Sequence, residues 1–181
     1  MTADEALERL LEGNKRFVSG DLEHPRRDDE RRAEQAEGQT PFAVILGCAD
    51  SRVPPEIVFD QGIGDLFIVR VAGNTAADDV TLGSIEFAVS VLQCPLLFVL
   101  GHAQCGAVAA ALRAMAEGTE LGGYLGALTD PIRPAIRGVD GLDAGIAENV
   151  RRQVAHLANV FPETHVVGAR YDLHTGRVQL L

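Results

Sequence analysis

The chain has 181 residues, 46% of them hydrophobic and 23% charged, which is the balance of a globular domain with a sizeable core. A formal net charge of −10 argues against nucleic acids and anionic membrane surfaces as partners, because both would repel the protein. The amino-terminal stretch is charged and amphipathic, and no apolar run approaches the roughly 20 residues that cross a bilayer, so we expect a cytoplasmic protein.

Residues 1–40 are expected to form a helical arm that precedes the folded core. Residues 3–18 place apolar side chains at near-helical spacing, and residues 19–40 are dense in charge, which predicts a solvated loop and helix. The rest of the chain carries no internal repeat. We therefore expect a single domain over residues 1–181, made of the arm and an α/β core over 41–181. The apolar positions of the first helix are Ala6, Leu7, Leu10, Leu11 and Phe17.

Short apolar runs, rich in branched residues, predict strands that are buried on both faces. Such runs are typical of parallel sheets, and helical stretches lie between them. This alternation predicts an α/β fold with a mostly parallel sheet of four strands, a C-terminal antiparallel edge strand, and helices on both faces. The strands are expected at 41–46, 66–71, 95–100, 165–173 and, after a turn at 174–176, at 177–181; the helices at about 78–92, 103–117 and 143–160, with an irregular segment over 118–142 that holds at most one short helix.

Two of these strands end in residues that bind metals. Cys48 follows the first strand, His102 follows the third, and Cys105 falls in the first turn expected for the next helix. Ligand sites of open parallel sheets lie beyond the carboxyl ends of the strands, and an i, i+3 pair shares one helical face, so the three side chains are predicted to converge. Each has a packing interpretation when taken alone. Together, two sulfurs and one imidazole favour zinc with an open fourth position.

Asp50 and Arg52, just after the first cysteine, have two interpretations. Asp50 or Ser51 could cap a helix whose first residue is Pro54. The same residues suit a carboxylate held by an arginine beside the metal, where it would accept a hydrogen bond from zinc-bound water. That carboxylate could also ligate the metal directly and close the site. These alternatives stay open at the level of sequence.

The remaining thiol and imidazole groups lie outside this arrangement. Cys94 precedes Pro95 at the opposite end of its strand and is interpreted as a packing residue. Three cysteines make a poor disulfide framework, and a reducing compartment would keep them as thiols. The histidines interpreted as surface or packing residues are His24, His156, His165 and His174.

The segments CADSR at 48–52 and HAQCG at 102–106 resemble the C-x-D-x-R and H-x-x-C signatures of beta-class carbonic anhydrases. The resemblance extends from about Leu10 to YDLHTG at 171–176. It implies one Zn²⁺ per chain and the reversible hydration of carbon dioxide to bicarbonate and a proton. The implied zinc ligands are Cys48, His102 and Cys105.

The same resemblance implies roles for residues around the metal. Asp50 and Arg52 resemble the pair that positions zinc-bound hydroxide, and Gln39 resembles a glutamine that donates a hydrogen bond to the substrate. The residues implied in the substrate pocket are Phe67 and Phe87 as walls and the backbone N–H of Gly106 facing bicarbonate. From the residues alone, Gln39 would be an ordinary surface residue and Phe67 a core residue.

The family resemblance also implies a homodimer or homotetramer whose active sites form between chains. Members with a non-catalytic bicarbonate pocket use a tryptophan there; this chain has none, which favours a constitutively open site. Two alternatives are a related zinc hydrolase acting on carbonyl sulfide or carbon disulfide, and a non-catalytic zinc or bicarbonate-sensing module. Nucleotide binding is disfavoured, because Gly62-x-Gly64 lacks a third glycine and precedes a strand.

Overall fold

The core of the computed structural model, which describes residues 1–181, is one five-stranded sheet. Its strands are β1 (Ala43–Gly47), β2 (Leu66–Arg70), β3 (Leu96–His102), β4 (His165–Tyr171) and β5 (Val178–Leu180). The order across the sheet is β2-β1-β3-β4-β5. The first four strands run parallel, and β5 pairs antiparallel with β4 at the edge, so the predicted architecture is confirmed.

The two central strands are buried along their whole length because both of their faces are covered. Side chains alternate between the faces with a period of two. In β1, Ala43 and Ile45 contribute to one hydrophobic cluster, while Val44 and Leu46 contribute to the cluster on the other side. The unbroken apolar run therefore reflects burial on both faces, as expected for a central parallel strand.

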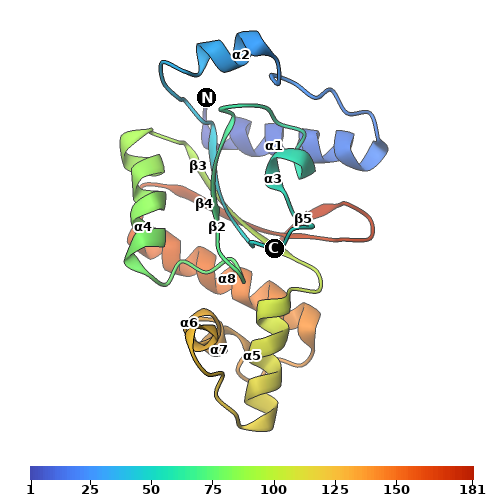
Figure 1. Cartoon of the computed structure of the whole chain (residues 1–181), viewed down its shortest axis with the longest axis vertical. Coiled ribbons are helices and arrows are strands. Elements are labelled where there is room, and N and C mark those ends of the chain that lie inside the picture. The colour runs from blue at the N-terminus through green and yellow to red at the C-terminus, as the bar shows by residue number, and fades with distance from the viewer.

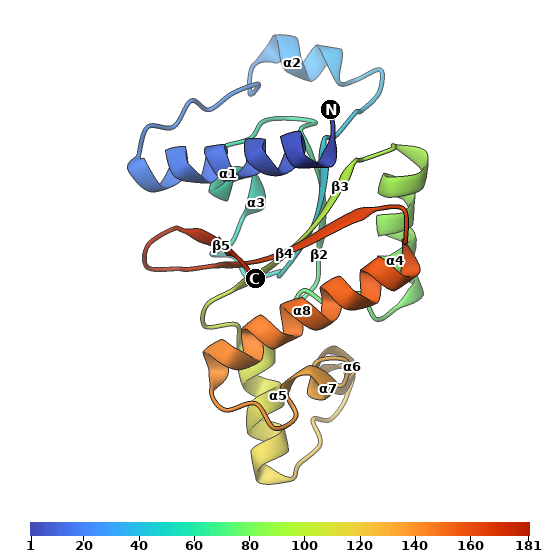
Figure 2. The same cartoon turned by 180° about the vertical axis from the view of Figure 1, so that it is seen from behind.

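Helices cover both faces of the sheet (Figures 1 and 2). They are α1 (Ala3–Ser19), α2 (Asp29–Glu34), α3 (Pro55–Val58), α4 (Asp79–Glu86) with the π-helical turn η1 (Phe87–Val91), α5 (Gly106–Glu117), α6 (Tyr124–Thr129), α7 (Arg133–Ile136) and α8 (Leu142–Val160). Side chains of α1 and α3 join the first cluster, and those of α4, η1 and α8 join the second. None of the helices combines the length and apolarity that crossing a bilayer requires.

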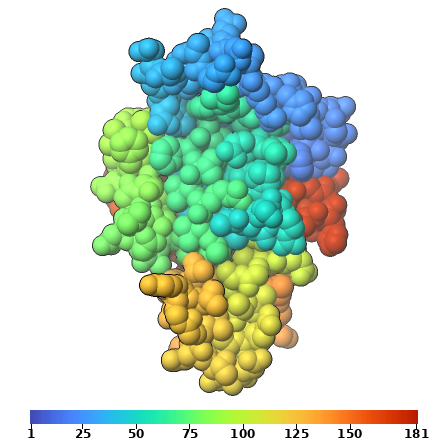
Figure 3. Space-filling view, viewed as in Figure 1, coloured from blue at the N-terminus to red at the C-terminus, as the bar shows by residue number.

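Two buried carboxylates connect the N-terminal segment to the rest of the molecule. Asp65, directly before β2, receives hydrogen bonds from Arg9 of α1 and Arg26 of the following loop at 2.8–2.9 Å. Asp60 receives one from Arg16 at 2.7 Å. The blue segment at the top of Figure 3 is therefore held by ion pairs as well as by the apolar face of α1.

Three expectations about the helices need correction. The segment 118–142 holds two short helices, α6 and α7, where at most one was expected. Helix α7 is stabilised by packing against α5 and α8, and its local sequence pattern does not predict it. The residues buried in this contact are Ile132, Ala135 and Ile136. The helix expected at 78–92 ends in the π-helical turn η1, and the helix expected from residue 103 begins at Gly106.

Candidate metal centre

Three potential metal ligands meet at the carboxyl end of the central strands. Cys48 directly follows β1, His102 is the last residue of β3, and β1 and β3 are neighbours in the sheet. The donor atoms of Cys48, His102 and Cys105 all lie within 4.8 Å of one another, and all three residues are buried. The predicted convergence is thus present in the structure, in a group positioned to bind a metal ion.

The convergence arises differently from the i, i+3 helical pair that we expected. His102 still belongs to β3, and Cys105 occupies the N-cap of α5 with an extended backbone (φ −65°, ψ 116°). Between them residues 103–104 form a turn, with Gln104 in the left-handed region at φ 57°. The two ligands therefore approach each other across a tight turn, and not along one face of a helix.

The His102 ring is oriented for metal binding through Nε2. Its Nδ1 lies 2.9 Å from the Ala103 carbonyl oxygen, so that nitrogen carries the proton in the neutral ring. The other nitrogen, Nε2, is buried without a hydrogen-bond partner, and the residue is 0% exposed. A buried acceptor without a partner is costly, and a cation at this point would satisfy it.

The two cysteine sulfurs lie close enough to affect each other's ionisation. The neighbouring Cys105 thiol and the hydrogen bond from the Gly73 N–H hold the pKa of the Cys48 thiol well below its ordinary value. The same contact with Cys48, together with burial, raises the pKa of Cys105. Two adjacent thiolates repel each other, so both sulfurs ionise only when a cation lies between them. The residues present therefore fit a thiophilic divalent metal.

Asp50 and Arg52 form a tight pair beside this group. Arg52 donates from Nε to Asp50 Oδ1 at 2.9 Å and from Nη2 to Oδ2 at 2.7 Å, which is a bidentate arrangement. The hydrogen bonds from Arg52 hold the pKa of Asp50 well below its usual range. Oδ2 of Asp50 lies 3.9 Å from His102 Nε2, so the carboxylate borders the position a metal would take.

The helix-cap interpretation of this segment is wrong. Helix α3 begins at Pro55 with Pro54 at the N-cap, and no side chain caps it. Asp50 instead accepts from the Arg52 backbone N–H at 2.9 Å, in a local turn. The carboxylate is therefore free of the helix and faces the cysteine and histidine ligands.

Comparison with known proteins identifies the family. A family model described as carbonic anhydrase matches residues 43–178. Carbonic anhydrase 2 of Mycobacterium tuberculosis is 45% identical, over 94% of this chain and 89% of its own length. A beta-carbonic anhydrase structure from Aspergillus fumigatus has a TM-score of 0.73 at 28% identity, covering 84% of this chain and 80% of that one. This chain belongs to the beta-carbonic anhydrase family. One of two tetrameric beta-carbonic anhydrases from Sordaria macrospora gives a TM-score of 0.71 at 26% identity, covering 83% of this chain and 85% of that one.

The remaining predicted residues come from different elements of the fold. Gly106 is exposed and directly follows Cys105. Phe67 of β2 and Phe87 of η1 lie together, with ring centroids 6.3 Å apart, and Phe87 is 45% exposed. Gln39 is exposed ahead of β1, so the whole strand separates it from Cys48.

Sequence reasoning missed Arg70, the last residue of β2, and Gly73, which lies three residues further along the chain. Arg70 donates from Nε to the Cys48 carbonyl oxygen at 2.8 Å, and the Gly73 N–H donates to Cys48 Sγ at 3.3 Å. A charged residue inside an apolar run, followed by glycine at the same edge of the sheet, was the available signal. Such positions hold the ligands' backbone and sulfur in place.

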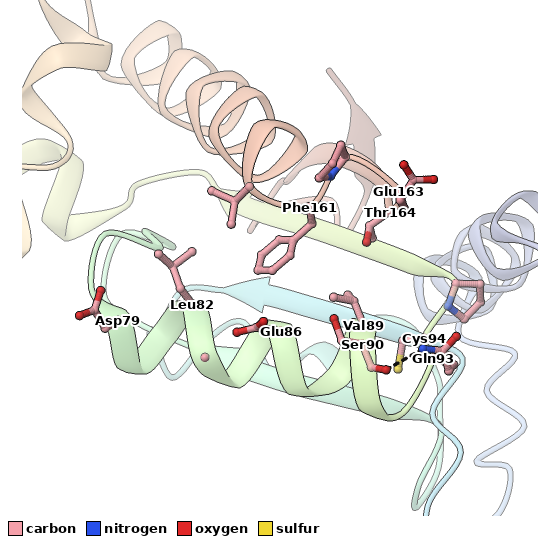
Figure 4. A pocket seen from close by; sticks show the side chains of 14 residues that line it. Asp79, Leu82, Glu86, Val89, Ser90, Gln93, Cys94, Phe161, Glu163 and Thr164 are labelled. Atoms are coloured by element: carbon pink, nitrogen blue, oxygen red, sulfur yellow. Dashed lines mark hydrogen bonds between the residues drawn. The ribbon is translucent and has the colours of Figure 1, made fainter.

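A separate cavity lies away from this cysteine and histidine cluster. A hollow of about 870 Å³ opens between α4 and the chain after α8, at the opposite end of the sheet from the metal ligands. Leu82, Glu86 and Val89 line one side and Phe161 the other (Figure 4). Its one sulfur, Cys94, contacts the Pro41 carbonyl oxygen at 3.3 Å, and burial raises its pKa to about 11. A protonated lone thiol is a packing group, as the sequence indicated.

Proposed function

We propose that this protein catalyses the reversible hydration of carbon dioxide to bicarbonate and a proton, with one zinc ion held by Cys48, His102 and Cys105. The observation that supports this most directly is the buried cluster of two sulfurs and an imidazole within 4.8 Å, combined with an unpartnered His102 Nε2. Two soft ligands and one borderline ligand match the preference of zinc. Zinc bound there would act as a Lewis acid that makes water nucleophilic near neutral pH.

The protein's own groups would prepare the site before any substrate arrives. The Ala103 carbonyl fixes the tautomer and orientation of His102. Arg52 holds Asp50 and also reaches the Gln104 carbonyl oxygen at 3.4 Å, so one guanidinium connects the segments that carry all three ligands. A preorganised set of this kind needs little rearrangement during reaction.

Asp50 would serve as the anionic acceptor that orients the attacking group. Both of its oxygens are already bonded to Arg52, and leaving that partner to ligate the metal would break two charge-assisted hydrogen bonds. We therefore propose that the open arrangement, with Asp50 on Arg52, is the resting state. The Gly106 N–H, at the start of α5, would face the bicarbonate product.

A second copy of the chain would complete the substrate pocket. The family resemblance implies that Gln39 and the Phe67–Phe87 pair line the substrate pocket of a site formed between two chains. The exposed Phe87 (45%) lies against Phe67 of the edge strand β2, and the exposed Val91 (64%) belongs to the same π-helical turn as Phe87. We propose that this surface joins two chains, and the tetrameric Sordaria macrospora relatives support an assembly of that kind.

Stopped-flow hydration of carbon dioxide by zinc-quantified protein tests the proposal. We expect about one zinc per chain and activity that disappears on chelation and returns with zinc. Protein that carries zinc but does not hydrate carbon dioxide would contradict the assignment. Parallel assays with carbonyl sulfide and carbon disulfide would show whether such a protein is a hydrolase of one of these compounds. Inactivity on carbon dioxide, carbonyl sulfide and carbon disulfide would favour a non-catalytic zinc or bicarbonate-sensing module.

A further inference from the structure

A tight turn after β2 delivers a backbone donor to Cys48. The Asn74 N–H donates to the Val71 carbonyl at 2.8 Å and closes the turn, with Gly73 in the left-handed region at φ 80°. A side chain at Gly73 is unfavourable, because the backbone is left-handed there and a Cβ would lie 2.7 Å from Ile132 Cδ1. The Gly73 N–H then reaches Cys48 Sγ at 3.3 Å. The direction of this N–H depends on how the turn is held.

One face of α8 holds the chain after β2. Asn149 Nδ2 donates to the Gly73 carbonyl at 2.9 Å, and Gln153 Oε1 accepts from the Ala76 N–H at 3.0 Å. One helical turn further, His156 Nε2 lies 3.1 Å from the Ala76 carbonyl. Of these three side chains, only Asn149 contacts the residue that also contacts Cys48.

Gly73 needs such an anchor more than another residue would. Glycine has wide backbone freedom, so its own geometry does not hold the N–H toward the sulfur. Asn149 fixes the carbonyl on one side of the Gly73 Cα, and the N–H that meets Cys48 lies on the other side. Holding the carbonyl restricts rotation about Gly73 and so keeps the N–H directed at the sulfur.

The burial of Asn149 has no other visible purpose. The residue is 0% exposed, its Nδ2 bonds Gly73, and its Oδ1 has no partner. A buried amide with an unpaired oxygen is unfavourable for stability, and an apolar residue of the same size would avoid that cost. We infer that the hydrogen bond to Gly73 offsets this stability cost.

We propose that Asn149 is a positioning residue for the metal ligand Cys48, acting through the backbone of Gly73. A hydrogen bond to a ligating sulfur orients it and draws charge from it, and this tunes both metal affinity and the electronic state of the bound metal. The inference rests on the proposed metal function of Cys48, His102 and Cys105. It assigns a role in that site to a residue whose sequence position is about one hundred residues from Cys48.

The test replaces Asn149 with leucine in the full-length protein, which removes the donor and keeps a similar volume. Zinc affinity is measured by competition with a chelator, and the sulfur-to-metal charge-transfer band is recorded after substitution with cobalt(II). We expect zinc affinity to fall by about 10- to 100-fold. The band should move to longer wavelength, because a sulfur without its hydrogen bond donates charge more readily.

Gln153→Leu is the matched control. Gln153 is 4% exposed, lies one turn along on the same helix, and holds the same segment at Ala76 and not at Gly73. This variant should lose thermal stability but keep the wild-type affinity and cobalt spectrum. If Asn149→Leu folds poorly, Asn149→Ala removes the same donor with a smaller apolar side chain, and it carries the same expectation.

Three results would overturn the inference. Wild-type affinity and spectrum in folded Asn149 variants would show that the contact does not act on the metal ligand. Equal changes in the Asn149 and Gln153 variants would indicate general loosening of the segment. Failure of the wild-type protein to bind zinc or cobalt would instead refute the proposed function itself, together with any role for Asn149 in it.

Discussion

Replacing Asp65 with asparagine tests how strongly the N-terminal segment is held to the sheet. The carboxylate is 4% exposed, and it accepts hydrogen bonds from Arg9 at 2.9 Å, from Arg26 at 2.8 Å and from the Gly62 N–H at 2.7 Å. Asparagine keeps one acceptor oxygen but removes the charge that faces both guanidinium groups. Removing one partner from a fully buried ion pair costs about 3–5 kcal/mol.

The expected loss is smaller than that range, because the arginine side chains are 30% and 37% exposed and solvent screens them. We expect about 2–3 kcal/mol of unfolding free energy, or a melting temperature lower by roughly 4–12 °C for a chain of this size. Urea unfolding at fixed protein and zinc concentrations measures this loss of unfolding free energy. The control is Asp29→Asn, which breaks an ion pair with Arg32 whose side chains are 90% and 68% exposed and should change stability by less than about 0.5 kcal/mol.

The same variant has a signature in pH. Burial raises the pKa of Asp65, but the hydrogen bonds from Arg26 and Gly62 and the charge of Arg9 outweigh it, so the folded pKa lies below 3.8. Stability from this carboxylate is therefore complete above its unfolded pKa and is lost as the pH falls through the folded value. Asp65→Asn should flatten the acid side of the stability profile. An equal loss in the Asp65 and Asp29 variants, or no loss near neutral pH, would refute the reasoning.

Three further predictions concern the site and the assembly. Arg52→Ala and Asp50→Asn should keep zinc but lower the carbon dioxide hydration rate by about 10²–10⁴-fold, and wild-type rates in both across pH 7–9 would exclude a catalytic role for the pair. Cys105→Ser should lose most of its zinc by elemental analysis while Cys94→Ala keeps it, because only the first sulfur belongs to the ligand cluster; zinc loss in the Cys94 variant would argue against that assignment. Phe87→Glu should reduce the molar mass seen by light scattering and the hydration rate together, and a fully active wild-type monomer would refute a pocket shared between chains.

The local pattern of residues was sufficient to predict the fold class and the grouping of Cys48, His102 and Cys105. Buried parallel strands appear as short apolar runs because both faces of the sheet are covered, and their carboxyl ends lie at one edge by the rules of α/β topology. Cysteine and histidine directly after two such runs therefore pointed to one place in space. The C-terminal edge strand was predictable for a similar reason, since the turn at 174–176 reverses the chain between β4 and β5.

Only the tertiary structure could show the contacts between segments that lie far apart in the chain. The turn that replaces a helical pair at Cys105, the short helix α7 packed on α5 and α8, and the approach of Asn149 to Gly73 have no local periodicity. Each exists because burial in the folded chain outweighs weak or contrary local preference. The roles of Gln39, Phe67 and Phe87 stay predictions for the same physical reason: the surfaces that would give them a function belong to a second chain, which neither the local pattern nor the fold of one chain specifies.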